Sequence, residues 1–563
     1  MKRILAMTAV VLFSSTAAIA ADAPEAMLPE RAMAAADTID EALLRGHIRF
    51  LSSDLLEGRG PSTLGDQLTQ LYLATEMESL GLEPAGPDGS WYQPFDIVGV
   101  NTRMPEEWTF SSGGKSVSLD SSEEFMISSG VQKPKLSLNG ADLVFVGYGI
   151  QAPEYGWDDF KGHDLKGKVV VMLNNDPDWS PDLFAGETRL YYGRWTYKYE
   201  SAARQGAAGA IIIHTTPSAG YPWQVVETSW AGEQFQLPAG DEPRTPVQAW
   251  VTEDAAREIL SLSGHDLDQL TKQARSKDFR PVPLGVTTSV EASNEVAKVR
   301  TANVAGILRG SDPVLNQEVV VYTAHHDHLG KAEGDDEDLI YNGALDNASG
   351  TAQVLGIARA FASLPERPQR SVMFLFVAAE EQGLLGSAFY AAHPTFLPGR
   401  MAANINLDGG NIWGATRDLT FIGLGKSTMD DYVLAFAEMQ GRTVKPDQFP
   451  DRGFFYRSDQ FNFAKLGVPA VFTDTGTDFV GRPEGWGKEQ IEKWEAVNYH
   501  QASDELEDWW SFDGMIQDAQ LSFFVGAAVA EADEMPVWNP GDEFEAARKE
   551  ALAEAGRLMN QKD

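Results

Sequence analysis

The sequence predicts an α/β fold in which helices cover a mostly parallel central sheet, with a smaller α+β module inserted into the chain. Two observations carry this prediction. From residue 303 onward, short apolar and β-branched runs alternate with helical patterns, which is typical of strands buried between two layers of helices. Between residues 141 and 251, four apolar β-like runs enclose one helical pattern and carry little charge.

Length and composition limit what the chain can be. Its 563 residues exceed one ordinary domain, so we expect two or three. Cysteine is absent, which excludes disulfides, thiolate metal sites and a cysteine nucleophile. The formal net charge of −37 argues against nucleic acid and membranes as partners and favours solubility. The oligomeric state is left open.

Residues 1–20 have the pattern of a secretory signal peptide. Lys2 and Arg3 precede an apolar run over 4–13, and small residues follow at 18–20. The apolar run is shorter than the roughly 18 residues that a membrane span needs. We therefore expect cleavage after Ala20 and a bacterial periplasmic or secreted protein, a setting that suits an exported chain without cysteines.

The segments before the main α/β region are predicted as follows. The N-terminal part, residues 21–138, should begin with two amphipathic helices within 38–82, and short β-like pieces should follow. Residues 139–292 should form the α+β module, with its helix at 196–205. A polar, charged segment at 276–294 precedes the alternating region.

Residues 293–535 carry the strongest strand and helix alternation. A C-terminal tail, 536–563, is expected to form an exposed amphipathic helix. The predicted elements of the alternating region are strand 303–310, strand 319–324, helix 349–364, strand 371–378, helix 383–393, strand 401–407, strand 418–423, helix 427–440 and helix 513–532.

Acidic and imidazole side chains recur where the predicted strands end. In an open parallel sheet, ligands bind outside the carboxyl ends of the strands, so these groups should converge although they are distant in sequence. Two histidines and three carboxylates without sulfur suit a pair of divalent ions, best two Zn²⁺, and one of two adjacent glutamates can stay free as a general base. The candidates are His325, Asp327, Asp346, Glu380, Glu381, Asp408 and His500.

Five motifs around these residues resemble those of the M28 family of zinc exopeptidases, in family order. They are AHHDHLG, GALDNASG, AAEEQGLLGS, NINLDGG and YHQASDE. LEGRG and WYQPF are similar to the family's N-terminal portion. Within residues 139–292, DDFKGHDLKGKVVVMLNNDP and KYESAARQGAAGAIIIHTT resemble a protease-associated domain. The resemblance implies a zinc exopeptidase, phosphorylase/hydrolase-like fold of the aminopeptidase type.

The resemblance also implies roles for individual residues. His325, Asp346 and Asp408 would hold one zinc ion, while Asp346, Glu381 and His500 would hold the other, which makes Asp346 the bridge.

Three further residues have roles by the same resemblance. Glu380 would act as the general base on a water between the metals. Tyr499 would donate a hydrogen bond to the tetrahedral oxyanion. Asp327 would accept the other N–H of the His325 imidazole and fix its tautomer.

The implied function is an exported dinuclear zinc metallopeptidase that removes N-terminal residues from peptides. The alternatives are a carboxypeptidase or dipeptidase, a glutaminyl-cyclase-like enzyme, and a non-catalytic binding protein on the same scaffold. A cyclase resembles a one-zinc version, and a binding protein would have lost ligands or the base, so the full set of residues argues against both.

Several neighbouring features have simpler interpretations. His326 is expected to pack or form a hydrogen bond, and His328 is left open. The acidic run 333–338 lacks the spacing of an EF-hand loop and is interpreted as a solvated loop. Residues 457–459 should lie at the substrate rim, where the sequence does not decide which of them touch substrate. The side-chain preference of the enzyme is also open, and the inserted module is interpreted as a lid or wall.

Overall fold

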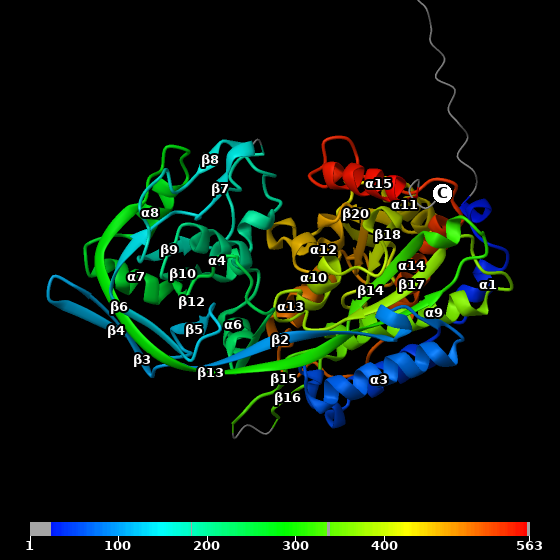
Figure 1. Cartoon of the computed structure of the whole chain (residues 1–563), viewed down its shortest axis with the longest axis horizontal. Helices are drawn as coiled ribbons and strands as arrows, with labels where there is room; N and C mark the ends of the chain where they lie inside the picture. The colour runs from blue at the N-terminus through cyan, green and yellow to red at the C-terminus, as the bar shows by residue number, and fades with distance from the viewer. Residues whose placement is uncertain (1–23, 182, 335–337, 560–563) are drawn as a thin grey trace, which may run out of the picture.

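One continuous β-sheet runs through the molecule and joins two halves (Figure 1). The computed structural model describes residues 24–181, 183–334 and 338–559. The predicted signal peptide lies outside these residues, as does part of the acidic run 333–338. Among the described helices, none is both long and apolar enough to cross a membrane.

The larger half of the molecule, called here the α/β half, is built on a sheet with parallel central strands. β21, β18, β14 and β17 are parallel neighbours, while β19 and β13 flank them in antiparallel orientation. This arrangement confirms the predicted α/β class with a mostly parallel central sheet. The order across the sheet is β20 (Thr443–Pro446), β19 (Asp418–Ile422), β21 (Ala470–Asp474), β18 (Met401–Asn406), β14 (Val319–His325), β17 (Ser371–Val377) and β13 (Val282–Leu308).

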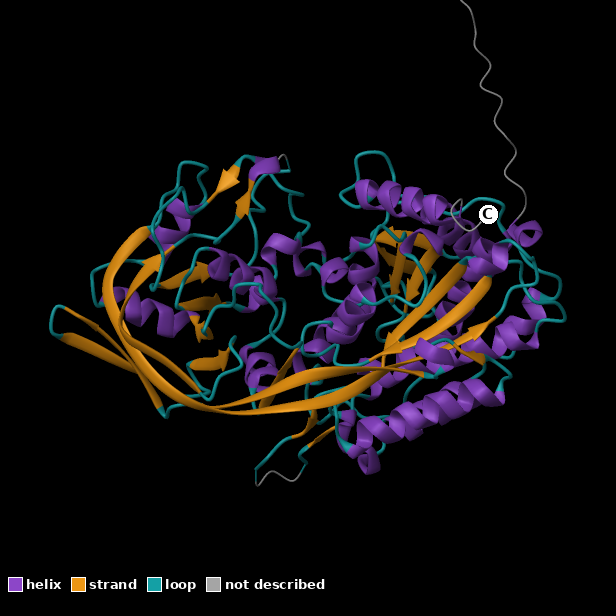
Figure 2. Ribbon diagram, viewed as in Figure 1, coloured by secondary structure: helices purple, strands orange, loops and turns teal. Residues whose placement is uncertain are grey.

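Helices cover both faces of this sheet, which explains why its strands are continuous apolar runs (Figure 2). In β14, Val320 and Tyr322 pack into the core on one face, and Val319 and Val321 pack into the core on the other. The first face is covered by α1 (Ala32–Ala36), α2 (Glu41–Leu51), α3 (Leu64–Ser79), α9 (Gly350–Ser363), α11 (Met429–Met439) and α14 (Asp513–Glu531). The second is covered by α10 (Leu385–Ala392) and α12 (Gln460–Lys465).

The smaller half, called here the inserted half, has its own hydrophobic cores. Strands β3 to β5, which the prediction left in the N-terminal part, join its sheet because β5 pairs with β12 and β3 with β13. Its strands are β3 (Glu107–Ser112), β4 (Lys115–Asp120), β5 (Phe125–Ser129), β6 (Lys135–Phe145), β9 (Val169–Leu173), β10 (Gly209–His214) and β12 (Val247–Thr252). Its helices include α4 (Trp195–Arg204), α6 (Trp223–Trp230), α7 (Glu253–Ser261) and α8 (Leu267–Ala274).

Strand β13 connects the two halves directly. It is 27 residues long and runs across residue 292, where the sequence placed a boundary. Its partner β2 (Tyr92–Arg103) pairs along it from Ser293 to Val304. The first part of β13 lies in the polar, charged segment 276–294, and there Leu284, Val286 and Val290 alternate with exposed residues, as in a strand with one buried face. Most of this polar segment is therefore part of a strand.

The C-terminal helix α15 (Glu545–Met559) is docked on the α/β half, in contrast to the expected exposed tail. Arg548 is buried, and its Nη1 donates to the carbonyl oxygen of Met401 at 2.9 Å. Ala551 and Ala555 are also buried. The small residues on one face of the helix permit this close packing.

Candidate metal centre

The residues predicted to carry the chemistry come from strand ends that lie side by side. His325 is the last residue of β14, Glu380 and Glu381 follow β17, and Asp408 follows β18. β14 lies between β17 and β18, and all three strands are parallel, so their C-terminal ends meet at one edge of the sheet.

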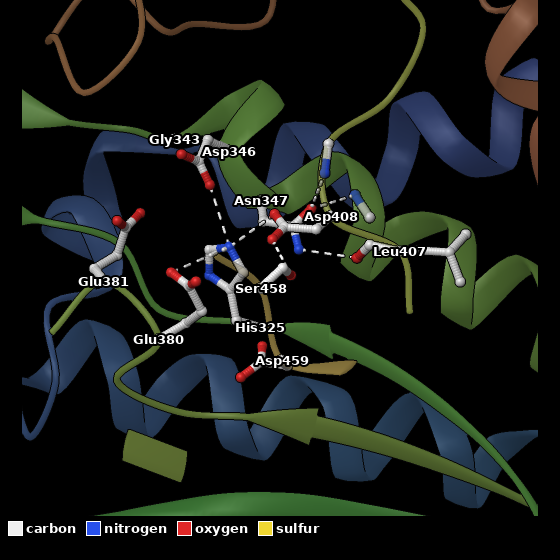
Figure 3. Close-up of polar contacts among 12 residues, drawn as sticks. His325, Gly343, Asp346, Asn347, Glu380, Glu381, Leu407, Asp408, Ser458 and Asp459 are labelled. Atoms are coloured by element: carbon white, nitrogen blue, oxygen red, sulfur yellow. Dashed lines mark hydrogen bonds and ion pairs between the residues drawn. The ribbon is translucent and has the colours of Figure 1, made fainter. Parts of the chain in front are cut away.

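Asp346 lies between two groups of ligand candidates and offers one carboxylate oxygen to each. Its Oδ1 lies 3.2 Å from His325 Nε2, which is also 3.1 Å from Asp408 Oδ1. Its Oδ2 lies 3.3 Å from His500 Nε2, which is also 2.9 Å from Glu381 Oε2. Figure 3 shows the first group, with the imidazole of His325 directed at Asp346 and Asp408. The structure thus brings together all five predicted metal ligands.

The separations among these atoms suit divalent metal ions. In a tetrahedral site with bonds of 2.0–2.1 Å, neighbouring ligand atoms lie about 3.3 Å apart. The four distances above range from 2.9 to 3.3 Å. His500 Nε2 is buried and, within the described part of the chain, has no hydrogen-bond partner in spite of its short contacts. Ligand atoms of His325, Asp346 and Glu381 also lie within 4.8 Å of one another. The residues present therefore fit a metal centre.

The charges of the site favour a bound cation. Burial lowers the pKa of His500, but Glu381 and Asp346 outweigh burial and raise it to about 10. Burial likewise lowers the pKa of His325, and Asp408 and Glu380 reverse this and raise it well above the ordinary value. The carboxylates therefore stabilise positive charge at both imidazoles, and a metal ion would supply that charge in place of protons.

Asn347 ties together the two loops that carry Asp346 and Asp408. Its Nδ2 donates to the carbonyl oxygen of Leu407 at 3.1 Å, and its Oδ1 accepts from the backbone N–H of Gly409 at 2.9 Å (Figure 3). The first bond is buried and the second is partly buried, and together they fix one carboxylate ligand relative to the other.

Two further buried side chains hold the ligand loops from outside. Asp504 Oδ2 accepts the backbone N–H of Asp346 at 3.0 Å. Arg59, which is 1% exposed, donates to four backbone carbonyl groups, and these bonds explain the LEGRG segment. The sequence pointed to motifs containing Asn347, Asp504 and Arg59 but gave these residues no role. The carbonyl groups bound by Arg59 belong to Leu51, His326, Asn342 and Gly343.

Asp327 is placed differently from the expectation. Its Oδ1 lies 3.8 Å from His325 Nδ1, which is too far for a hydrogen bond. His325 Nδ1 instead lies 3.2 Å from the backbone carbonyl oxygen of Asp327. The Asp327 carboxylate accepts the backbone N–H of Glu380 at 3.1 Å. Asp327 therefore orients the imidazole through its main chain and the Glu380 segment through its side chain.

The two other histidines of the AHHDHLG motif form separate contacts. His326 Nε2 lies 3.1 Å from Asp66 Oδ1 on α3, so its side chain is turned away from His325. His328, which was left open, has its Nδ1 2.5 Å from Glu381 Oε1. His328 thus contacts a ligand candidate from outside and holds its carboxylate.

Glu380 stands next to the ligand candidates without joining them. Its Oε2 lies 4.0 Å from His325 Nε2, compared with 3.3 Å or less for the five candidates (Figure 3). Burial raises the pKa of Glu380 well above its ordinary value, and Glu381 and Asp408 add to this rise against the opposing effect of His325. A carboxyl group with a raised pKa can hold a proton, as a general base must.

Residues 457–459 have three different roles. Arg457 Nη2 donates to the hydroxyl oxygen of Tyr499 at 3.2 Å. The Ser458 hydroxyl group donates to Asp408 Oδ2, and Asp459 Oδ1 accepts from the Ser387 hydroxyl group at 2.5 Å. Arg457 lines the cavity between the two halves together with Glu380 and Tyr499, and Ser458 lines a second cavity that also contains these two residues.

Ser229 of the inserted half reaches the metal centre, a contact that the sequence did not suggest. It lies on α6, and its Oγ is 2.7 Å from His500 Nδ1. His500 follows α13 (Trp486–Val497), which the prediction also missed. A hydrogen bond to the second imidazole nitrogen fixes the tautomer that leaves Nε2 free for metal.

Loss of the Ser229 hydroxyl group is expected to weaken metal binding. The Ser229→Ala variant should bind metal about 10–100-fold more weakly at the site that contains His500, as is usual when an outer hydrogen bond to a ligand is removed. Competition with a chromophoric chelator measures this. Ser261→Ala, at an exposed position in the same half, is the control and should bind like the unmodified protein. Equal affinity in all three proteins would exclude a role for Ser229.

Comparison with known proteins gives consistent results. Residues 303–523 match the model of peptidase family M28. The chain is 25% identical over 475 residues to Aminopeptidase YwaD of Bacillus subtilis (strain 168), an alignment that covers 82% of this chain and 80% of that protein. It is 40% identical over 94 residues to a probable zinc metalloprotease of Pyricularia oryzae, covering 16% of this chain and 18% of that one.

A solved structure supports the fold. The aminopeptidase from Aneurinibacillus sp. strain AM-1 superposes with a TM-score of 0.51 at 20% identity, over 90% of this chain and 96% of that one. Its likeness extends beyond the residues that match the family model, so both halves take part in the shared fold. The segment that matches peptidase family M28 contains all five ligand candidates described above, so the metal centre lies wholly in the part of the chain that is similar to this family.

Proposed function

We propose that this chain is an exported dinuclear zinc aminopeptidase that hydrolyses N-terminal residues from peptides. The observation that carries the proposal is the carboxylate of Asp346, whose two oxygens face His325 and His500 at 3.2 and 3.3 Å. Two imidazoles and three carboxylates without sulfur are a suitable donor set for zinc. The names of the two relatives, an aminopeptidase and a probable zinc metalloprotease, support this metal and cleavage at the N-terminus.

Different residues of the chain would carry out different steps of the hydrolysis. When bound, zinc lowers the pKa of water and polarises the peptide carbonyl group. Glu380 takes the proton of the attacking water and transfers it to the leaving amine. Its carboxylate is 4.0 Å from His325 Nε2 and is therefore close to the reacting atoms without being held as a ligand.

Tyr499 is placed to stabilise the developing oxyanion. Burial raises the pKa of Tyr499, so its phenol keeps the proton that it donates. Arg457 donates to the phenol oxygen at 3.2 Å, which orients the ring and increases the acidity of the hydroxyl group. One preorganised donor of this kind contributes about 3 kcal/mol of transition-state stabilisation.

The inserted half would act as a protease-associated domain that forms a wall of the substrate cavity. A cavity of about 510 Å³ is lined by both halves and reaches Glu380, Glu381 and His500. Its size admits short or unfolded peptides. Export rests on the pattern of residues 1–20, and the N-terminus of the processed protein tests it.

Blocked peptides test the proposed reaction. The purified protein is expected to cleave Leu-Ala-amide, to lose this activity with a chelator, and to regain it with added zinc. Acetylation of the substrate's amino group should abolish cleavage, because an aminopeptidase requires a free N-terminus, whereas amidation of the carboxyl end should not. Cleavage of the acetylated but not the amidated peptide would assign carboxypeptidase activity instead.

A further inference from the structure

Two arginines in the cavity between the halves lack carboxylate partners. Arg194 comes from the inserted half and Arg457 from the α/β half, and both line the cavity that reaches Glu380 and His500. Both side chains are half-buried. Among the described residues, neither forms an ion pair with an acidic side chain, and Arg194 Nε and Arg457 Nη1 are buried without any hydrogen-bond partner.

Aromatic groups account for part of the surroundings of Arg457. Its guanidinium lies 5.5 Å from the ring centre of Tyr221, 5.0 Å from that of Phe454 and 5.9 Å from that of Tyr499. Its Nη2 donates to the Tyr499 hydroxyl group. These contacts hold the plane of the guanidinium, and Glu380 offsets part of its charge, but Nη1 is left without a hydrogen-bond partner among the described residues.

A third arginine adds positive charge to the same region. Arg189 is 3% exposed, and its Nη2 also lacks a hydrogen-bond partner among the described residues. Burial, together with the charges of Arg457 and Arg189, lowers the pKa of Arg194 to about 10. Asp176 offsets part of the charge of Arg189, whereas Tyr221 and Tyr499 have this effect on Arg194. The three arginines therefore act on one another, and two of them, Arg194 and Arg457, line the cavity without an ion-pair partner among the described residues.

Buried arginines without ion-pair partners destabilise the folded protein unless a ligand supplies the missing negative charge. A buried charge without a partner is destabilised by its loss of hydration. Guanidinium groups present a planar fork of N–H donors that matches a carboxylate, and such charge-assisted hydrogen bonds are stronger than neutral ones. The nitrogen atoms without partners are the donors that this ligand would use.

We propose that Arg194 and Arg457 bind a carboxylate group of the peptide substrate, so that the enzyme selects anionic short peptides. This proposal rests on the proposed peptidase function, since it assumes that the cavity holds substrate. The carboxylate can be the free C-terminus of a dipeptide or the side chain of an acidic residue at the first or second position. All three present the same group to the same two arginines.

Three pairs of peptides distinguish these sources by their kcat/KM ratio. Leu-Ala against Leu-Ala-amide tests the free C-terminus. Leu-Glu-amide against Leu-Gln-amide tests an acidic second residue, and Glu-Ala-amide against Gln-Ala-amide tests an acidic first residue. In one pair, the anionic peptide is expected to be preferred by about tenfold or more, as hydrogen bonds to a charged group imply.

Variants of Arg194, the arginine of the inserted half, then test whether this residue causes the preference for the anionic peptide. Arg194→Gln is expected to bring the ratio close to one, and Arg194→Lys, which keeps the charge but lacks the fork, to reduce it in part. Arg244→Gln is the matched control. Arg244 lines the same cavity, but its Nη1 and Nη2 already donate to Gln236 and Leu237 at 2.7 and 3.0 Å, so the ratio should remain as in the unmodified enzyme.

Two results would overturn the proposal. One is a ratio close to one in all three pairs for the unmodified enzyme, and the other is a preference that survives in Arg194→Gln. Failure of the peptidase function looks different, because the unmodified enzyme would then cleave neither member of any pair.

Discussion

The Glu380→Gln variant is expected to keep its metal ions and to lose about 10³-fold in kcat. The substitution keeps the shape of the side chain and removes only its capacity to take a proton. Metal should be retained because Glu380 lies 4.0 Å from His325 Nε2, outside the group of His325, Asp346 and Glu381 whose ligand atoms converge. Steady-state kinetics with Leu-Ala-amide and elemental analysis of the same sample measure the two quantities.

The neighbouring glutamate provides a matched control. Glu381→Gln makes the same chemical change one residue further on, at a carboxylate that lies 2.9 Å from His500 Nε2. This variant should lose metal from the site that contains His500, and its activity should fall for that reason. If Glu380→Gln lost metal and Glu381→Gln retained it, the roles of the two glutamates would have to be exchanged.

The Asp346→Asn variant is expected to lose both metal ions. An amide offers one neutral oxygen in place of two charged ones, whereas Asp346 faces His325 with Oδ1 and His500 with Oδ2. The loss in affinity at each site should exceed the 10–100-fold that removal of an outer hydrogen bond costs. Elemental analysis after dialysis should find well under one ion per chain.

Asp408→Asn is the control for a carboxylate that serves one site alone. Asp408 Oδ1 lies 3.1 Å from His325 Nε2, and Asp408 belongs to the first of the two ligand groups. This variant should retain about one ion, bound near Glu381 and His500. Equal metal loss from Asp346→Asn and Asp408→Asn would mean that Asp346 is not shared between two sites.

Much of the α/β half was predictable because its central strands are buried on both faces. A strand such as β14 is then a continuous apolar run, and the predicted 319–324 differs from Val319–His325 by one residue. The first part of β13 escaped prediction, since its single buried face leaves polar residues at every second position. Helix α13 was missed for a related reason: only Gly487 is buried along its length, so it shows little apolar periodicity.

The metal ligands were accessible to sequence reasoning, whereas the residues that support them were not. Each strand end carries its ligand within three or four residues, and parallel strands place those ends together. Ser229 is 271 residues from His500, and no local pattern links them. Arg59 is separated in the same way from the loop at Gly343, and Arg194 from Arg457. The packing of the inserted half on the α/β half brings Ser229 to His500 and Arg194 to Arg457, whereas Arg59 reaches its loop within the α/β half.

The zinc content of the purified, unmodified protein tests the central claim most directly. Elemental analysis by mass spectrometry, combined with zinc titration of the metal-free protein against activity on Leu-Ala-amide, should find two ions per chain and full activity at two equivalents. Full activity in the metal-free protein, or saturation of both binding and activity at one ion, would contradict a dinuclear centre built on Asp346.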